Sequence, residues 1–178
     1  MIRYKKITLF LIKFFGTYFL LFALYAYYIN NTQQKGNVFG CSPLTVKVAD
    51  QTTAVLNFFG YNASSVQHEK EMSVKLLIDN VYIARVIEGC NSMSIIILFI
   101  AFIVAFAGKP KVTIIYALIG SFIIYSINVL RIAFLTVMLY KYPNQQEVLH
   151  ALVFPGIIYG TTFLLWVIWV QKFSNYKK

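Results

Sequence analysis

The chain has 178 residues, of which 59% are hydrophobic and 12% are charged. Its mean hydropathy is +0.67 and its formal net charge is +10. This composition excludes an ordinary soluble domain and indicates an integral membrane protein. The basic excess predicts membrane topology and attraction to anionic lipid, and we expect no nucleic-acid partner.

Four apolar segments meet or approach the length of about 20 helical residues that a bilayer core requires. They cover about residues 7–29, 91–107, 112–139 and 149–170. The first could be taken for a secretory signal, but it is long, rich in Phe and Tyr and lacks a small-x-small cleavage site. We therefore expect a retained anchor in an all-α bundle of about four transmembrane helices, with residues 1–178 forming a single domain.

Lysines and arginines next to these segments predict the orientation of the chain. They precede the first segment, fill the turn between the second and third, and follow the fourth: Arg3, Lys5, Lys6, Lys109, Lys111, Lys172, Lys177 and Lys178. All six acidic residues lie in connections on the opposite side of the membrane. Both termini are therefore predicted to be cytoplasmic.

Residues 30–88 form the one sizeable extracytoplasmic segment. Between Pro43 and Gly60, apolar residues recur at helical spacing: Leu44, Val48, Val55, Leu56 and Phe59. This pattern predicts an amphipathic helix on the outer membrane surface. The runs SVKLLI and VYIARVI flank an Asp-Asn pair and predict a β-hairpin that leads directly to the sequence EGC at residues 88–90.

Three predicted helices each carry one chemically distinctive polar residue. Counted at about 1.5 Å per residue from the cytoplasmic ends of their helices, Cys90, Arg131 and His150 lie at heights of roughly 26, 28 and 30 Å. A thiol, a guanidinium and an imidazole are therefore expected at one level, near the outer membrane boundary. The polar residues stop at this level, which argues against a small transporter.

Each of these residues also has a structural interpretation. Cys90 could be a small buried residue or the disulfide partner of Cys41. His150 could be an interfacial residue and Arg131 a snorkelling side chain. Arg131 carries the strongest signal, because a guanidinium inside an apolar segment is costly unless it is paired or lines a wet cavity.

Together the three residues form the outline of a cysteine acyl-transfer site. A helix N-terminus and a nearby guanidinium both favour the Cys90 thiolate. An imidazole can move protons, and an arginine can stabilise the oxyanion of a tetrahedral intermediate. Asn128, one turn before Arg131, would orient Arg131 or a substrate carbonyl, or make an interhelical hydrogen bond.

Other motifs point to packing or are missing. The sequence GIIYG at residues 156–160 has the small-residue spacing of close helix packing. We find no phosphate loop, no pair of catalytic carboxylates and no metal-ligand spacing, so we expect neither a metal nor another cofactor.

The polar residues resemble a known pattern, that of the exosortase/archaeosortase family, and most closely the exosortase F type of Bacteroidetes. The resemblance rests on EGC at the start of one helix, N-x-x-R in the next and His at the start of the last. It implies that Cys90, Arg131 and His150 are catalytic, within helices covering about residues 90–170. Asn128 and Glu88 belong to the same motifs and are candidate supporting residues.

The resemblance implies a membrane-embedded cysteine transpeptidase or protease of the bacterial cytoplasmic (inner) membrane, with its active site facing the periplasm. Such enzymes cleave C-terminal sorting signals of exported proteins at the outer face of the membrane and transfer them to a surface acceptor. The implied substrates end in a short motif, a transmembrane helix and a basic tail. A substrate helix with a cytoplasmic basic tail would hold its motif at the height of Cys90.

A non-enzymatic membrane scaffold or assembly factor is the competing hypothesis. In it, Cys41 and Cys90 form a disulfide and Arg131 pairs with lipid phosphate or a partner helix. A free Cys90 favours the enzyme, whereas a bridged Cys90 favours the scaffold.

Overall fold

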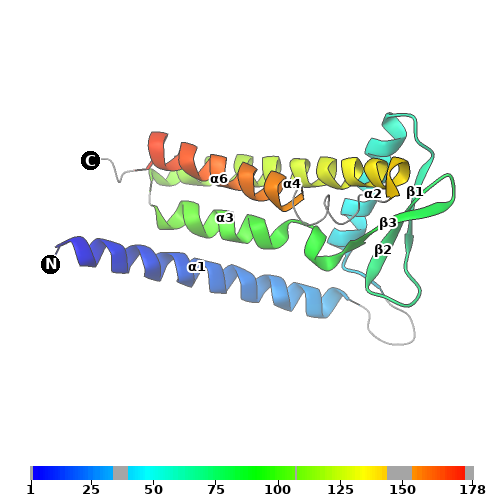
Figure 1. Ribbon diagram of the computed structural model, residues 1–178. Coiled ribbons are helices and arrows are strands. Elements are labelled where there is room, and N and C mark those ends of the chain that lie inside the picture. Colours follow the sequence, from blue (N-terminus) through cyan, green and yellow to red (C-terminus); the bar gives the residue numbers. More distant parts are fainter. Residues whose placement is uncertain (1, 34–39, 107, 144–153, 175–178) are drawn as a thin grey trace.

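The computed structural model describes residues 2–33, 40–106, 108–143 and 154–174, and it is mostly helical. Its helices are α1 (Ile2–Thr32), α2 (Pro43–Phe58), the 3-10 turn η1 (Glu88–Cys90), α3 (Met93–Ala105), α4 (Pro110–Lys141) and α6 (Phe154–Lys172). The strands β1 (Ala63–Gln67), β2 (Ser73–Ile78) and β3 (Val81–Ile87) lie between α2 and η1 in the chain. Figure 1 shows α1, α3, α4 and α6 side by side, with α2 and the sheet at one end of the bundle.

Helix α3 is the centre of the bundle, because it contacts α1, α4 and α6. Its buried Phe99 joins Ile124 of α4 and Ile158 and Trp169 of α6 in one apolar cluster. The Phe99 ring lies over Gly120 of α4, where an added Cβ would come within 2.3 Å of the ring. The absence of a side chain at Gly120 therefore permits α3 and α4 to pack closely.

Two helices of the described residues are long and apolar enough to cross a membrane, Lys6–Thr32 within α1 and Pro110–Lys141, which is α4. Helix α3 has 13 residues and is shorter than the predicted segment 91–107, because the left-handed Ser92 (φ 60°) separates it from η1. Helix α6 has 19 residues. The prediction of a helical membrane protein is confirmed, whereas the count of four crossings stays a prediction.

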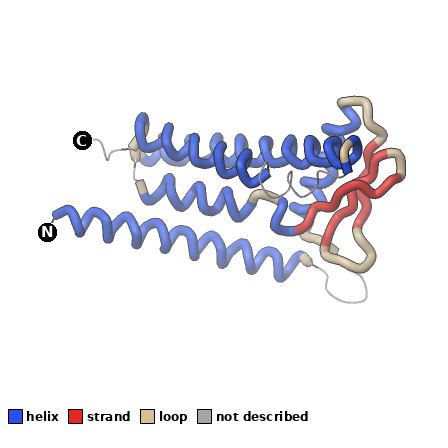
Figure 2. Tube along the Cα trace, in the orientation of Figure 1, coloured by secondary structure: helices blue, strands red, loops and turns tan. Residues whose placement is uncertain are grey.

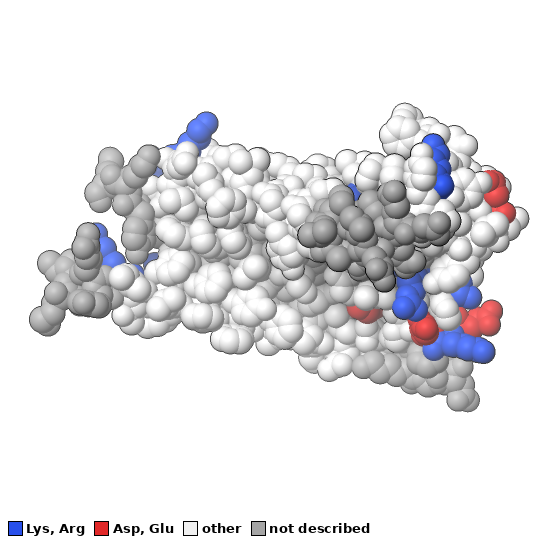
Figure 3. Space-filling model, viewed as in Figure 1, with Lys and Arg blue, Asp and Glu red and all other residues white. Residues whose placement is uncertain are grey.

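Charged side chains on the face shown in Figure 3 gather toward the two ends of the molecule and leave an uncharged surface between them. The acidic side chains lie at the end that carries the sheet. Helix α4 has 32 residues, which corresponds to roughly 48 Å and exceeds a bilayer core of about 30 Å. If α4 crosses the membrane along the bilayer normal, part of the helix therefore lies outside the core.

The strands form one antiparallel sheet in the order β1-β2-β3. The predicted hairpin is confirmed as β2 and β3, and its turn residues Asp79 and Asn80 have φ values of 51° and 63°, as a tight hairpin turn requires. Strand β1 was not predicted. Its sequence, ASSVQ, is mostly polar, and its two apolar residues, Ala63 and Val66, are three positions apart, so it shows neither the alternation nor the apolar run of a typical strand.

Helix α2 confirms the predicted helix and shows what its buried face packs against. The face packs against α4 and the sheet, and its members share helical spacing: Thr45, Val48, Ala49, Thr52 and Leu56. Threonine and alanine thus form part of this buried face. The sequence prediction counted only large apolar residues and therefore did not include them. Phe59, which the pattern placed on the apolar face, is 67% exposed. The face predicted to meet lipid is therefore buried mainly within the protein.

The prediction of close packing at GIIYG is wrong. A Cβ added at Gly156 or Gly160 would meet no atom within 4 Å, so these glycines face open space. The close approaches occur instead at Gly120 and at Gly108, where an added Cβ would lie 3.0 Å from the Trp169 ring. Spacing alone did not reveal which side of α6 faces its neighbours.

Candidate active site

Cys90 lies where the sheet joins the bundle. Strand β3 ends at Ile87, η1 carries Cys90, and Ser92 adopts a left-handed conformation before α3 begins. These two changes of direction hold the thiol at the end of α3 nearest the sheet, where Figure 2 shows the strands meeting the helices. The thiol is free and partly buried.

A pocket of about 220 Å³ contains Cys90 and Arg131 together. Strand β3, η1, α4 and α6 supply its lining residues: Ala84, Arg85, Val86, Gly89, Cys90, Arg131, Ile132, Leu135 and Pro155. Electrostatic interactions connect the Arg131 guanidinium with the Cys90 thiol and with Tyr159 of α6. The structure therefore brings Cys90 and Arg131 together, as their predicted heights require, and their catalytic roles stay a prediction.

Asn128 is buried and lies one turn before Arg131 on α4. Its side-chain Nδ2 donates a hydrogen bond of 2.7 Å to the backbone carbonyl oxygen of Cys90. Asn128 therefore ties α4 to the backbone at the thiol. Of the predicted roles, an interhelical hydrogen bond is the one that the structure supports, here between α4 and the 3-10 turn η1.

Glu88 is directed away from the pocket and toward the N-terminus of α2. Its carboxylate oxygens accept hydrogen bonds from the backbone N–H of Ser42 (2.6 Å), the Ser42 hydroxyl (2.8 Å) and the Thr45 hydroxyl (2.6 Å). Partial burial opposes ionisation, but these hydrogen bonds outweigh it and lower the pKa of Glu88 below its ordinary value. Glu88 therefore anchors the loop before Cys90 rather than the thiol itself.

The sequence interpretation missed the residues that hold the other side of Cys90. Asn91 is buried, its Nδ2 donates to the Tyr25 hydroxyl at 2.7 Å, and its Oδ1 accepts the backbone N–H of Met93 at 3.1 Å. A second, longer bond joins Asn91 Nδ2 to Thr45 Oγ1 at 3.3 Å. The polar Asn91 before an apolar helix was a visible signal, but its partners in α1 and α2 were not.

Cys41 is buried and free, so the disulfide required by the scaffold hypothesis is not formed. The Gln67 side-chain Nε2 donates a weak hydrogen bond of 3.7 Å to the Cys41 sulfur. Burial raises the pKa of the Cys41 thiol, although the Gln67 bond opposes this shift. Cys41 is therefore a poor candidate for a nucleophile.

His150, the third predicted catalytic residue, lies outside the described residues. Helix α6 is described from Phe154, and its Pro155 lines the pocket of Cys90. Within the described ranges, no group of three His, Cys, Asp or Glu side chains could hold a metal ion.

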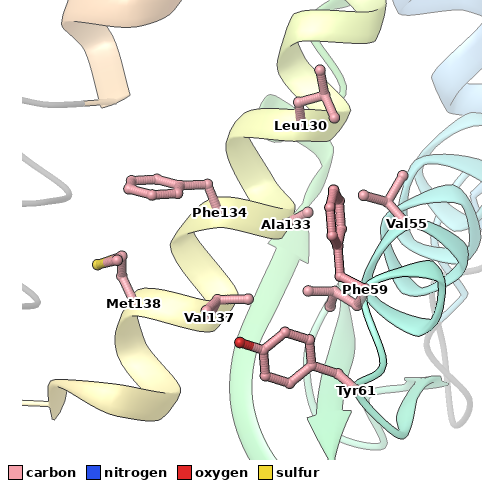
Figure 4. A pocket seen from close by; sticks show the side chains of 9 residues that line it. Val55, Phe59, Tyr61, Leu130, Ala133, Phe134, Val137 and Met138 are labelled. Atoms are coloured by element: carbon pink, nitrogen blue, oxygen red, sulfur yellow. The ribbon is translucent and has the colours of Figure 1, made fainter.

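Two larger pockets are apolar and contain neither thiol nor guanidinium. One, of about 420 Å³, lies between α2 and α4, with Phe59, Tyr61 and Phe134 among its lining residues (Figure 4). The other, of about 390 Å³, lies among α1, α2 and α3 and includes Tyr25 and Met93. Pocket size therefore does not identify the reactive site, whereas the chemistry of the side chains does.

Comparison of the sequence with known protein families identifies the family of this chain. Residues 7–169 match the family model described as transmembrane exosortase, a span that includes every predicted site residue. The chain belongs to the transmembrane exosortase family. No curated protein and no solved structure matches it.

Family membership supports a membrane protein with a function in protein sorting. Exosortases are in general cysteine transpeptidases that act on exported proteins bearing C-terminal sorting signals. The pocket contains a thiol and a guanidinium, Cys90 and Arg131, which are two of the three groups that the sequence interpretation assigned to such chemistry.

Proposed function

We propose that the chain is an exosortase that cleaves C-terminal sorting signals at the outer face of the membrane, with Cys90 as the nucleophile. The observation that supports this most is the common pocket of Cys90 and Arg131. These residues are 41 positions apart in the sequence and come from different elements. The pocket thus contains a sulfur nucleophile and a guanidinium that can stabilise an oxyanion.

In the proposed reaction, the Cys90 sulfur attacks the scissile carbonyl carbon and forms a thioester as the peptide C–N bond breaks. His150 takes the proton of the Cys90 thiol and passes it to the leaving amine, and Arg131 stabilises the oxyanion of the tetrahedral intermediate. An acceptor amine, or water, then attacks the thioester and gives its proton to His150, and the C–S bond breaks to release the Cys90 thiolate. Asn128 and Glu88 position the backbone on which the thiol sits.

The proposed topology has α1, α3, α4 and α6 crossing the bacterial inner membrane, with both termini in the cytoplasm. Supporting it are the uncharged surface between two charged ends and the length of α4. The whole chain acts as one domain, and its substrates carry a short motif, a transmembrane helix and a basic tail. We assign it to the exosortase F type on the sequence resemblance.

The test is processing of an exported protein from the same cells that ends in a motif, an apolar helix and a basic tail. We expect Cys90→Ala to abolish processing while the chain still accumulates in the membrane. Cys41→Ala is the matched control and should process normally. An unchanged yield from Cys90→Ala would exclude Cys90 as the nucleophile and overturn the proposal.

A further inference from the structure

Arg85 of β3 lines the same pocket as Cys90, on the side formed by the sheet. Its guanidinium forms an ion pair with the Glu71 carboxylate, and the side chains of both residues are 49% exposed. Exposed ion pairs contribute little net free energy, because water and salt screen both charges. Another carboxylate could therefore replace Glu71 on Arg85 at small cost.

Two guanidinium groups line the pocket, and a third basic residue is the strand partner of one of them. Lys75 pairs with Arg85 in the register of β2 and β3, so both side chains belong to one face of the hairpin. Arg131 lines the pocket from α4. The described lining residues include two guanidinium groups and no carboxylate. A peptide that displaces Glu71 from Arg85 therefore meets a positive field near the thiol.

We propose that Arg85, with Arg131 across the pocket, forms a subsite for a side-chain carboxylate of the peptide substrate near the scissile bond. The incoming carboxylate replaces Glu71 as the partner of Arg85. The planar guanidinium suits this task, because it can bind both oxygens of a carboxylate at once. The substrate assignment rests on the proposed function, but the preference for anions is a property of the pocket itself.

The test compares two thiol reagents that differ in one charge, N-(2-carboxyethyl)maleimide and neutral N-ethylmaleimide. Each reacts with the purified full chain, and mass spectrometry follows modification of the peptide that contains Cys90. The rate with the carboxylate reagent is divided by the rate with the neutral reagent, and this quotient is divided by the same quotient for 2-mercaptoethanol. Any change in the fraction of Cys90 thiolate affects both reagents equally and cancels in this ratio.

We expect the wild-type ratio to favour the carboxylate reagent about two- to fivefold, the range typical of one exposed charge contact. Arg85→Gln should bring the ratio close to 1, and Arg85→Lys should retain part of the preference. Glu71→Gln should increase the ratio, because it removes the competing carboxylate. Lys47→Gln, a matched loss of an exposed α2 cation outside the pocket lining, should leave the ratio unchanged.

A purely structural ion pair predicts a different pattern. Arg85→Gln and Glu71→Gln would then lower the ratio alike, or neither would change it, and either result would overturn the subsite. Because this assay needs no processing, its failure is distinguishable from failure of the proposed function. If the ratio is the same in all variants but processing still requires Cys90, only the subsite is contradicted. If Cys90→Ala still processes substrate, the proposed nucleophile is contradicted, but the measured ratio remains valid.

Discussion

The Asn128 side chain donates a 2.7 Å hydrogen bond to the carbonyl oxygen of Cys90, and so α4 holds the backbone at the residue that carries the thiol. Arg131 follows one turn later on the same helix and lines the pocket of that thiol. One helix thus fixes both the position of Cys90 and the guanidinium near it. The distance between the thiol and the guanidinium therefore depends on the position of α4, which carries both Asn128 and Arg131, and not on a loop.

Asn128→Ala should slow processing and lower the free energy of unfolding by about 1 to 3 kcal/mol, because it removes the hydrogen-bond donor of the partly buried Cys90 carbonyl. Thr136→Val is the control, since the buried Thr136 hydroxyl donates a hydrogen bond within α4, to the carbonyl of Ile132. Processing per inserted molecule and the thermal midpoint in detergent measure the two effects. Normal processing by Asn128→Ala would show that the bond does not position Cys90.

Arg131→Lys should reduce processing about 10²- to 10³-fold, the usual loss when one oxyanion contact is removed. Lysine keeps the charge but lacks the planar fork of donors. The measurement is processed substrate per unit of membrane-inserted variant. Wild-type turnover would assign Arg131 to lipid anchoring, because lysine snorkels as well as arginine does.

Acidification should weaken the contact between Glu88 and α2. Hydrogen bonds lower the pKa of Glu88 in the folded chain below its ordinary value of 4.5, although partial burial opposes them. The contribution of Glu88 to stability is therefore complete above pH 4.5 and is lost as the pH falls through the lowered value. Thermal midpoints measured from neutral pH downward should fall more for the wild type than for Glu88→Gln.

Glu69→Gln provides the comparison for this measurement, since Glu69 is an exposed acid of the loop before β2. It should follow the wild-type pH profile. If Glu88→Gln does so as well, the hydrogen bonds to Ser42 and Thr45 do not stabilise the fold.

Opposite ends of α4 should face opposite sides of the membrane. Lys109 and Tyr142 flank this helix and are exposed, so single cysteines at these positions can be labelled in a Cys41→Ala, Cys90→Ala background. An impermeant maleimide applied to intact spheroplasts should label Tyr142→Cys and spare Lys109→Cys until the membrane is opened. Labelling of both from the same side would contradict the proposed topology.

Much of this protein follows from local sequence. Composition identified the chain as a membrane protein, because a bilayer core requires long apolar helices. The helical spacing after Pro43 and the Asp-Asn pair at the hairpin turn act within a few residues, so α2 and the β2–β3 hairpin were predictable. The rise of a helix per residue is constant, and this alone placed Cys90 and Arg131 at one level.

Tertiary structure decided the features that join segments far apart in the chain. The polar segment β1 becomes a strand because its backbone pairs with the edge of β2. The lack of neighbours around Gly156 and Gly160 depends on the rotation of α6 about its own axis. Likewise, the direction of Glu88 depends on the α2 N-terminus, and the place of Arg85 beside Cys90 depends on how the sheet meets the bundle. Periodicity shows which side of a helix or strand is apolar, but a hydrogen bond or pocket between distant segments exists only once both are packed.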